Sequence, residues 1–152
     1  MYIALLFAHS WLRYLVLALG LWLLVLAIRH VRSNSPWSQG HERVYVGFLA
    51  ALDTQLLLGL LLYFVLSPVS AAALADFGSA MKDPTLRFFG VEHIATMLIA
   101  VAVAHVGRVR SKRKVGAARY RSTLVFQSIW LLLTLAAIPW PGLDIARPLF
   151  RM

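Results

Sequence analysis

The chain of 152 residues contains no cysteine and only 6 acidic residues. The absence of cysteine excludes disulfides, thiolate metal sites, iron–sulfur clusters and covalent attachment of haem through thioether bonds. It leaves open cofactors that are held without a covalent bond. The scarcity of acidic residues, against 15 Lys and Arg, gives the chain a formal net charge of +9.

A net positive charge also occurs in nucleic-acid-binding proteins. Here, however, the Lys and Arg residues cluster between apolar runs, as they do in the cytoplasmic loops of membrane proteins. Residues 29–43 and 107–121 hold ten of the fifteen basic residues, whereas residues 67–87 hold only two. We therefore expect the lipid bilayer, and no nucleic acid, as a partner.

Hydrophobic residues make up 61% of the chain. A soluble domain is nearer half apolar, and a domain of this size cannot bury the excess in one core. Four apolar segments have about the 20 residues that a membrane-spanning helix needs. They cover residues 2–28, 44–66, 88–106 and 123–140. The sequence thus predicts an all-α integral membrane protein, a four-helix transmembrane bundle that forms a single domain over residues 1–152.

The positions of the basic residues also predict an orientation. The positive-inside rule assigns 29–43 and 107–121 to the cytoplasm and both termini to the outer (periplasmic) side. The first apolar run lacks a positively charged start and is too long for a signal peptide, so we expect it to be retained as a helix. The predicted location is the bacterial inner membrane, with a multi-pass topology.

Polar groups inside these segments are candidate functional residues, because ionisable side chains are costly in lipid. They are His9, Arg13, Asp53, Gln55, Glu92, His93, His105 and Gln127. The first and third segments run in the same direction, which puts His9 and His93 at a similar depth. Two such histidines are able to bind a b-type haem iron from opposite faces. The alternative is that they form hydrogen bonds with each other, with backbone groups or with water.

The other polar candidates have less specific interpretations. Arg13 lies one turn from His9, where it is able to pair with a haem propionate or with Glu92. Asp53, Gln55 and Gln127 are candidates for a proton or quinone site, or for a polar clamp between helices.

The other three histidines are not expected to bind a haem iron. His105 follows His93 by 12 residues, which turns it about 120° around the helix, so we expect an interhelical or interfacial hydrogen bond there. For His30 and His41, in or beside a basic connection, we expect a solvated loop.

Several short strings occur in the order of a known family. They are His9-Ser10-Trp11-Leu12-Arg13-Tyr14, Gln55-Leu56-Leu57-Leu58-Gly59, Tyr63-Phe64, Met81-Lys82-Asp83, Arg87, Val91-Glu92-His93-Ile94, Arg110-Ser111-Lys112 and Ala137-Ile138-Pro139-Trp140-Pro141. Together they resemble small bacterial four-helix membrane proteins labelled cytochrome B, which are frequent in Bacteroidetes. The resemblance covers nearly the whole chain.

This resemblance implies haem b as cofactor and electron transfer in the membrane. It implies His9 and His93 as haem-iron ligands and Arg13 as the propionate partner. The chain differs from the family pattern at two places, because the family has a histidine where Asp53 stands and another near Arg108.

Three functions follow as hypotheses. The first is a haem-b protein or subunit for electron transfer, with a quinone as a possible partner. The second is a non-catalytic accessory subunit of a larger respiratory or photosynthetic complex, or a homo-oligomer. The third is a small transporter or proton-handling protein that uses Asp53. No phosphate-binding loop, metalloprotease motif or serine nucleophile elbow is present, so the sequence assigns no catalytic residue and no enzyme class.

Overall fold

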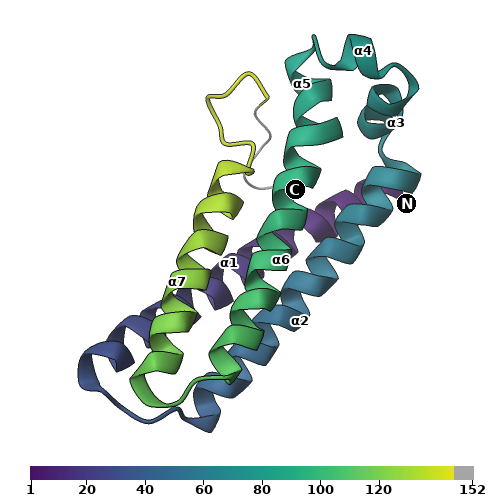
Figure 1. The fold of residues 1–152 in the computed structure, drawn as a ribbon. Helices are drawn as coiled ribbons and strands as arrows, with labels where there is room; N and C mark the ends of the chain where they lie inside the picture. Colours follow the sequence, from purple (N-terminus) through teal and green to yellow (C-terminus); the bar gives the residue numbers. More distant parts are fainter. Residues whose placement is uncertain (146–152) are drawn as a thin grey trace.

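Four long helices dominate the computed structural model, which describes residues 1–145 (Figure 1). They are α1 (Tyr2–Ser33), α2 (Gln39–Leu61), α6 (His93–Lys112) and α7 (Gly116–Ala136). A π-helical segment, η1 (Leu62–Leu66), extends α2. Between η1 and α6 lie α3 (Pro68–Ala75), α4 (Phe77–Ala80), α5 (Pro84–Arg87) and a second π-helical segment, η2 (Phe88–Glu92). The described part of the chain contains no strand.

The long helices pack side by side, with α1 against α2 and α7, and α6 against α7. Helices α2 and α6 contact each other least among these neighbours. The connections α1–α2 and α6–α7 lie together at one end of the molecule. Helices α3 to α5 lie at the opposite end, near the N-terminus (Figure 1). This arrangement confirms the predicted all-α fold.

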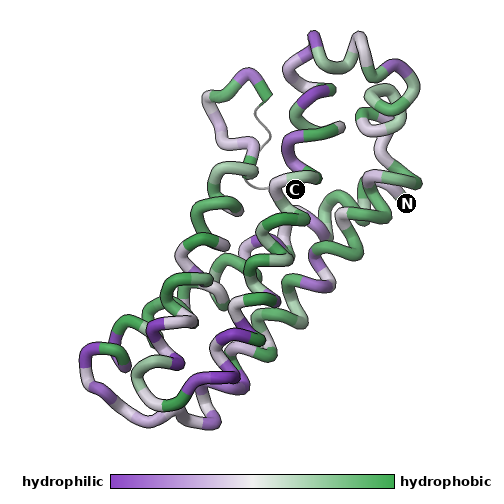
Figure 2. Tube along the Cα trace, viewed as in Figure 1, coloured by the Kyte–Doolittle hydropathy of each residue, from purple (hydrophilic) through white to green (hydrophobic). Residues whose placement is uncertain are grey.

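Three segments have the length and composition to cross a membrane. They are Tyr2–Ser33, Gln39–Leu66 and Pro84–Lys112, and much of their surface faces outward from the molecule. Figure 2 shows hydrophobic residues along the long helices and hydrophilic residues gathered at the end with the α1–α2 and α6–α7 connections. Together these features suggest a multi-pass membrane protein.

The helices extend further into the basic connections than the sequence predicted. Helix α1 continues to Ser33. The next residue, Asn34, is its C-cap and takes the left-handed conformation (φ 50°) typical of a helix C-terminus. Ser38 then caps α2 by accepting a hydrogen bond from the backbone N–H of His41. Charged side chains thus lie mainly on the ends of helices, because Arg and Lys are good helix formers and the loops themselves are short.

The opposite end is built from short helices, each with a recognisable start signal. Ser67, Asp76 and Asp83 are the N-caps of α3, α4 and α5. Pro68 and Pro84 follow two of these caps, at the first helical position that proline favours. The small, apolar stretch that follows Ser67 therefore forms the short helix α3.

Close packing of the long helices depends on two glycines. A Cβ atom at Gly20 would lie 2.2 Å from the Trp130 ring, and one at Gly107 would lie 2.4 Å from Cβ of Phe126. Trp130 is fully buried and contacts Phe48 edge-to-face, with ring centroids 4.7 Å apart. Small residues at these positions allow α7 to approach α1 and α6.

Candidate functional site

A cavity of about 430 Å³ lies among the long helices, in the half of the molecule nearer α3. Its walls come from α1, α2, η1, α3, η2, α6 and α7, and most of them are apolar. Val16, Leu52 and Trp130 line it on the side of the packed core, and Val69 and Ser70 of α3 line it on the other. This volume falls within the range of about 300–1,000 Å³ that is usual for ligand pockets.

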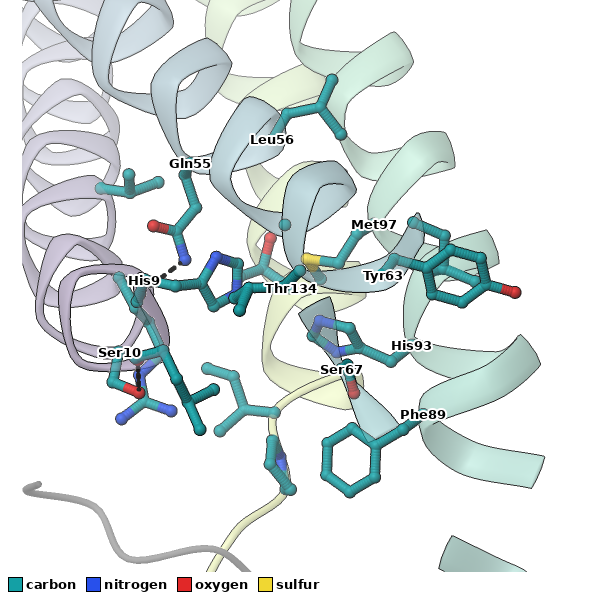
Figure 3. Close-up of a pocket in the computed structure, with 18 of the residues that line it drawn as sticks. His9, Ser10, Gln55, Leu56, Tyr63, Ser67, Phe89, His93, Met97 and Thr134 are labelled. Atoms are coloured by element: carbon teal, nitrogen blue, oxygen red, sulfur yellow. Dashed lines mark hydrogen bonds between the residues drawn. The ribbon is translucent and has the colours of Figure 1, made fainter. Parts of the chain in front are cut away.

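Two histidines from different helices enter this cavity (Figure 3). His9 comes from α1 and His93 from the first position of α6, and their ring centroids are 6.5 Å apart with an interplanar angle of 71°. A metal–imidazole bond is about 2.0 Å long, so two imidazoles on opposite sides of one metal ion have centroids about 6 Å apart. The observed spacing therefore leaves room for a single metal atom between the rings.

The orientation of His93 is fixed by the end of α7. Nδ1 of His93 lies 2.8 Å from the backbone carbonyl oxygen of Ala137. That carbonyl is available because α7 ends at Ala136 and Pro139, which lacks an N–H, cannot continue the helix. Donation from Nδ1 leaves Nε2 as the acceptor nitrogen, and metal-binding histidines are usually held by such a bond.

The position of His9 depends on α2. Gln55 donates a 2.9 Å hydrogen bond from Nε2 to the backbone carbonyl of His9. A Cβ atom at Gly59, one turn further along α2, would lie only 3.2 Å from Cε1 of His9. Glycine at this position therefore makes the space that the imidazole ring occupies.

Four side chains around the cavity have a buried polar atom without a hydrogen-bond partner in the described part of the chain. The atoms are Nδ1 of His9, Oε1 of Gln55, Nε1 of Trp130 and Oγ1 of Thr134. Buried polar atoms are nearly always paired, because an unpaired one costs about 1–3 kcal/mol. Their grouping around one hollow indicates a place for a ligand that has polar as well as apolar parts.

Among residues 1–145, Arg13 is the Lys or Arg side chain that lines the cavity. Its Nη2 donates to the Tyr14 hydroxyl at 3.0 Å, and its guanidinium lies 4.8 Å from the centre of the Tyr14 ring. Ser10, beside it on α1, also lines the cavity and donates to the Leu6 carbonyl. This part of the wall is therefore polar and positively charged, which suits a carboxylate.

The remaining predicted site residues lie elsewhere. Glu92 forms an exposed ion pair with Arg87 (2.8 Å), so it pairs with neither Arg13 nor His93. Gln127 donates to the backbone carbonyl of Gly20 at 3.3 Å. Neither lines the cavity.

Asp53 does not contact Gln55 or Gln127, the residues with which it was predicted to form a polar site. Its Oδ1 lies 2.8 Å from Nε2 of His105 on α6. The expectation of an interhelical hydrogen bond for His105 is thus confirmed, whereas the three polar residues of α2 and α7 do not meet.

The interpretation of His30 and His41 as solvated loop residues was wrong. Both rings pack against Tyr120, with centroid distances of 5.0 Å, and His41 is buried. The reason is that α1 and α2 extend into the predicted loop from both sides and carry both rings into a packed cluster. The connection predicted from the charges, residues 29–43, was longer than the one that the caps Asn34 and Ser38 enclose.

Other residues of the cavity were not predicted from the sequence. Tyr63 donates a 2.6 Å hydrogen bond to the Gly90 carbonyl and thereby ties η1 to η2. Met97 and Thr134 line the wall. Gly59, within an apolar helix and one turn from Gln55, carried the clearest signal, since glycine in such a helix marks a close approach.

Comparison with protein families, with characterised proteins and with solved structures finds no match to this chain.

Proposed function

We propose that this chain is a membrane b-type cytochrome that binds one haem between His9 and His93 and takes part in electron transfer. The observation that carries the proposal is the spacing of the two imidazoles, 6.5 Å between centroids, across a largely apolar cavity of about 430 Å³. His9 and His93 would hold the haem iron through their imidazole nitrogens, as histidines do in other haem proteins.

The small number of protein ligands favours haem over a bare metal ion. Within residues 1–145, no group of three or more His, Asp or Glu side chains is able to hold a metal. Structural and catalytic zinc sites use three or four protein ligands. With only two histidines available, the other coordination positions are best supplied by a macrocycle, and the chain has no cysteine for covalent attachment.

The other residues of the cavity fit the remaining parts of haem. Leu52, Leu56 and Met97 supply apolar wall for the macrocycle, and Arg13 supplies a cation for a propionate. The His93–Ala137 hydrogen bond holds one ring in the tautomer that leaves Nε2 available. When bound, haem supplies one-electron redox chemistry, and the protein supplies ligand geometry, exclusion of water and nearby charge.

The membrane arrangement that we propose has four crossings. Helices α1, α2 and α6 meet the requirements for a span, and α7 packs along α1 and α6 over much of their length. The basic α1–α2 and α6–α7 connections then face the cytoplasm, and the His9–His93 pair lies toward the periplasmic side of the inner membrane. The transporter hypothesis has less support, because Asp53 does not line the cavity.

The test is a reduced-minus-oxidised visible spectrum of the protein purified from haem-supplied cells. We expect the bands of a bis-histidine b-type haem in the wild type and their loss in His9→Ala and His93→Ala. His41→Ala is the matched control, since it removes a histidine outside the cavity and is expected to keep the spectrum. A folded, colourless wild-type protein would overturn the proposal.

A further inference from the structure

The Asp53–His105 pair presents polar atoms on an outward surface of the span. The pair bridges α2 and α6 with a 2.8 Å contact, yet the two side chains are 46% and 45% exposed. Asp53 follows Arg43 by ten residues, which is about 15 Å of helix. The pair therefore lies at hydrocarbon depth in the proposed membrane arrangement.

Only half of the hydrogen-bonding capacity of this pair is used within the described chain. Oδ1 of Asp53 and Nε2 of His105 face each other, which leaves Oδ2 and Nδ1 for an outside partner. Lipid tails offer no hydrogen bonds, and short side chains such as Asp and His cannot reach the headgroups from this depth. A polar partner at the same depth would remove the cost of this exposure.

A second copy of the chain supplies such a partner. All copies have the same orientation in a membrane, so a two-fold axis along the membrane normal brings equal depths together. When each pair holds two protons, one between Oδ1 and Nε2 and one on Nδ1, it has no net charge, Oδ2 is an acceptor and Nδ1–H is a donor. The symmetry then makes the contact from Nδ1–H of one copy to Oδ2 of the other twice. The pair is therefore complementary to itself.

The surrounding surface fits a close helix-to-helix contact. Exposed small side chains lie one turn from the pair on each helix, Ala50 on α2 and Ala102 on α6, with Thr54 beside Asp53. The other exposed side chains near them are apolar: Val46, Leu57, Leu98, Ile99 and Val106. Small residues let helices approach in lipid, and a polar group between them adds to the association.

We propose that the protein forms a two-fold symmetric homodimer through the exposed face of α2 and α6, with the two Asp53–His105 pairs hydrogen-bonded across the axis. This dimer does not depend on haem binding, because neither residue lines the cavity.

Because the chain has no cysteine, one introduced cysteine reports on this face directly. In native membranes treated with a mild oxidant, Ala102→Cys is expected to give a disulfide-linked dimer. Val125→Cys is the matched control, since Val125 is exposed on α7. Val125 and Ala102 lie at comparable distances from the basic end of the molecule, which is the end with the α1–α2 and α6–α7 connections. It is expected to remain monomeric under the same treatment.

A second variant tests the role of the pair itself. Adding Asp53→Leu and His105→Leu to Ala102→Cys is expected to lower the cross-linked fraction about tenfold, because both polar contacts are lost. Light scattering in mild detergent should show a dimer for the wild type and a monomer for the double leucine variant. The proposal fails if Ala102→Cys does not cross-link, or if the double leucine variant cross-links as well as its parent. Co-purification of a different protein or a quinone with a monomer would also overturn it. The visible spectrum, measured on the same samples, reports separately on haem binding.

Discussion

Each end of the long helices holds two histidines from different helices, in opposite surroundings. His9 and His93 face each other at 6.5 Å across a cavity, whereas the rings of His30 and His41 are 4.2 Å apart within a packed cluster. The second distance is too short for a metal atom between the rings. Of these two histidine pairs, only His9 and His93 have rings far enough apart for a ligand atom to lie between them.

The charges differ as much as the packing. At the basic end, Glu42 forms ion pairs with Arg108 and with Arg119, and Trp37 donates to the same carboxylate. Arg119 also lies 4.0 Å from the centre of the Trp37 ring. Among residues 1–145, the lining of the cavity has one Lys or Arg, Arg13, and no Asp or Glu. The end with His30 and His41 is therefore a packed, ion-paired contact between helices. The end with His9 and His93 is able to accept an anionic, flat ligand.

The largest expected effect that separates the two regions is on stability. Glu42→Gln removes the shared anion from two largely buried arginines and is expected to cost about 3 kcal/mol, because a partly buried pair is broken on one side only. Thermal unfolding in detergent measures the loss. Glu92→Gln is the control, since its pair with Arg87 is exposed and should contribute less than about 1 kcal/mol. Equal losses of stability in Glu42→Gln and Glu92→Gln would contradict the difference proposed between the two regions. The haem spectrum should persist in both variants.

A smaller effect is expected at Gly59. Gly59→Ala places a methyl group 3.2 Å from Cε1 of His9 and pushes the ring from its position. Overpacking of this kind costs about 1–3 kcal/mol, so we expect haem affinity to fall roughly tenfold or more. Haem titration of the haem-free protein measures it. Gly47→Ala, also on α2 but with open space around the new methyl, should leave affinity unchanged and make the helix slightly more stable. An unchanged affinity in Gly59→Ala would show that His9 is not constrained by α2.

The smallest effect concerns α4, one of the short helices at the same end of the molecule as the cavity. Hydrogen bonds from the Ser79 hydroxyl and backbone N–H lower the pKa of Asp76, the N-cap of α4. The cap is therefore intact above the ordinary aspartate pKa of about 3.9 and is lost as the pH falls through the lowered value. An NMR titration of the Ser79 amide should show a midpoint below about 3.9 that disappears in Asp76→Asn. A midpoint at or above the ordinary value would contradict the capping interaction.

The sequence predicted the helical architecture because apolar segments of this length have few alternatives. It also predicted that His9 and His93 share a depth, since depth along a helix follows from residue count and direction. It did not predict that Asp53 meets His105 rather than Gln127, because that depends on which helices are neighbours and how each is rotated. The burial of His41 escaped prediction for a different reason, since it follows from helix ends that continue beyond the apolar segments.

For this protein, composition and charge alone determined a helical chain with several apolar spans and polar groups within them. A single helix has a fixed rise and period, so the sequence sets the depth and the face of every residue on it. Only the tertiary structure decided that two of the five histidines face a cavity, that two pack together, and that the fifth pairs with Asp53 on the surface. The physical reason is that glycines such as Gly20 and Gly59, and the end of α7 at Ala136, set the distances between helices, and no local pattern contains those distances.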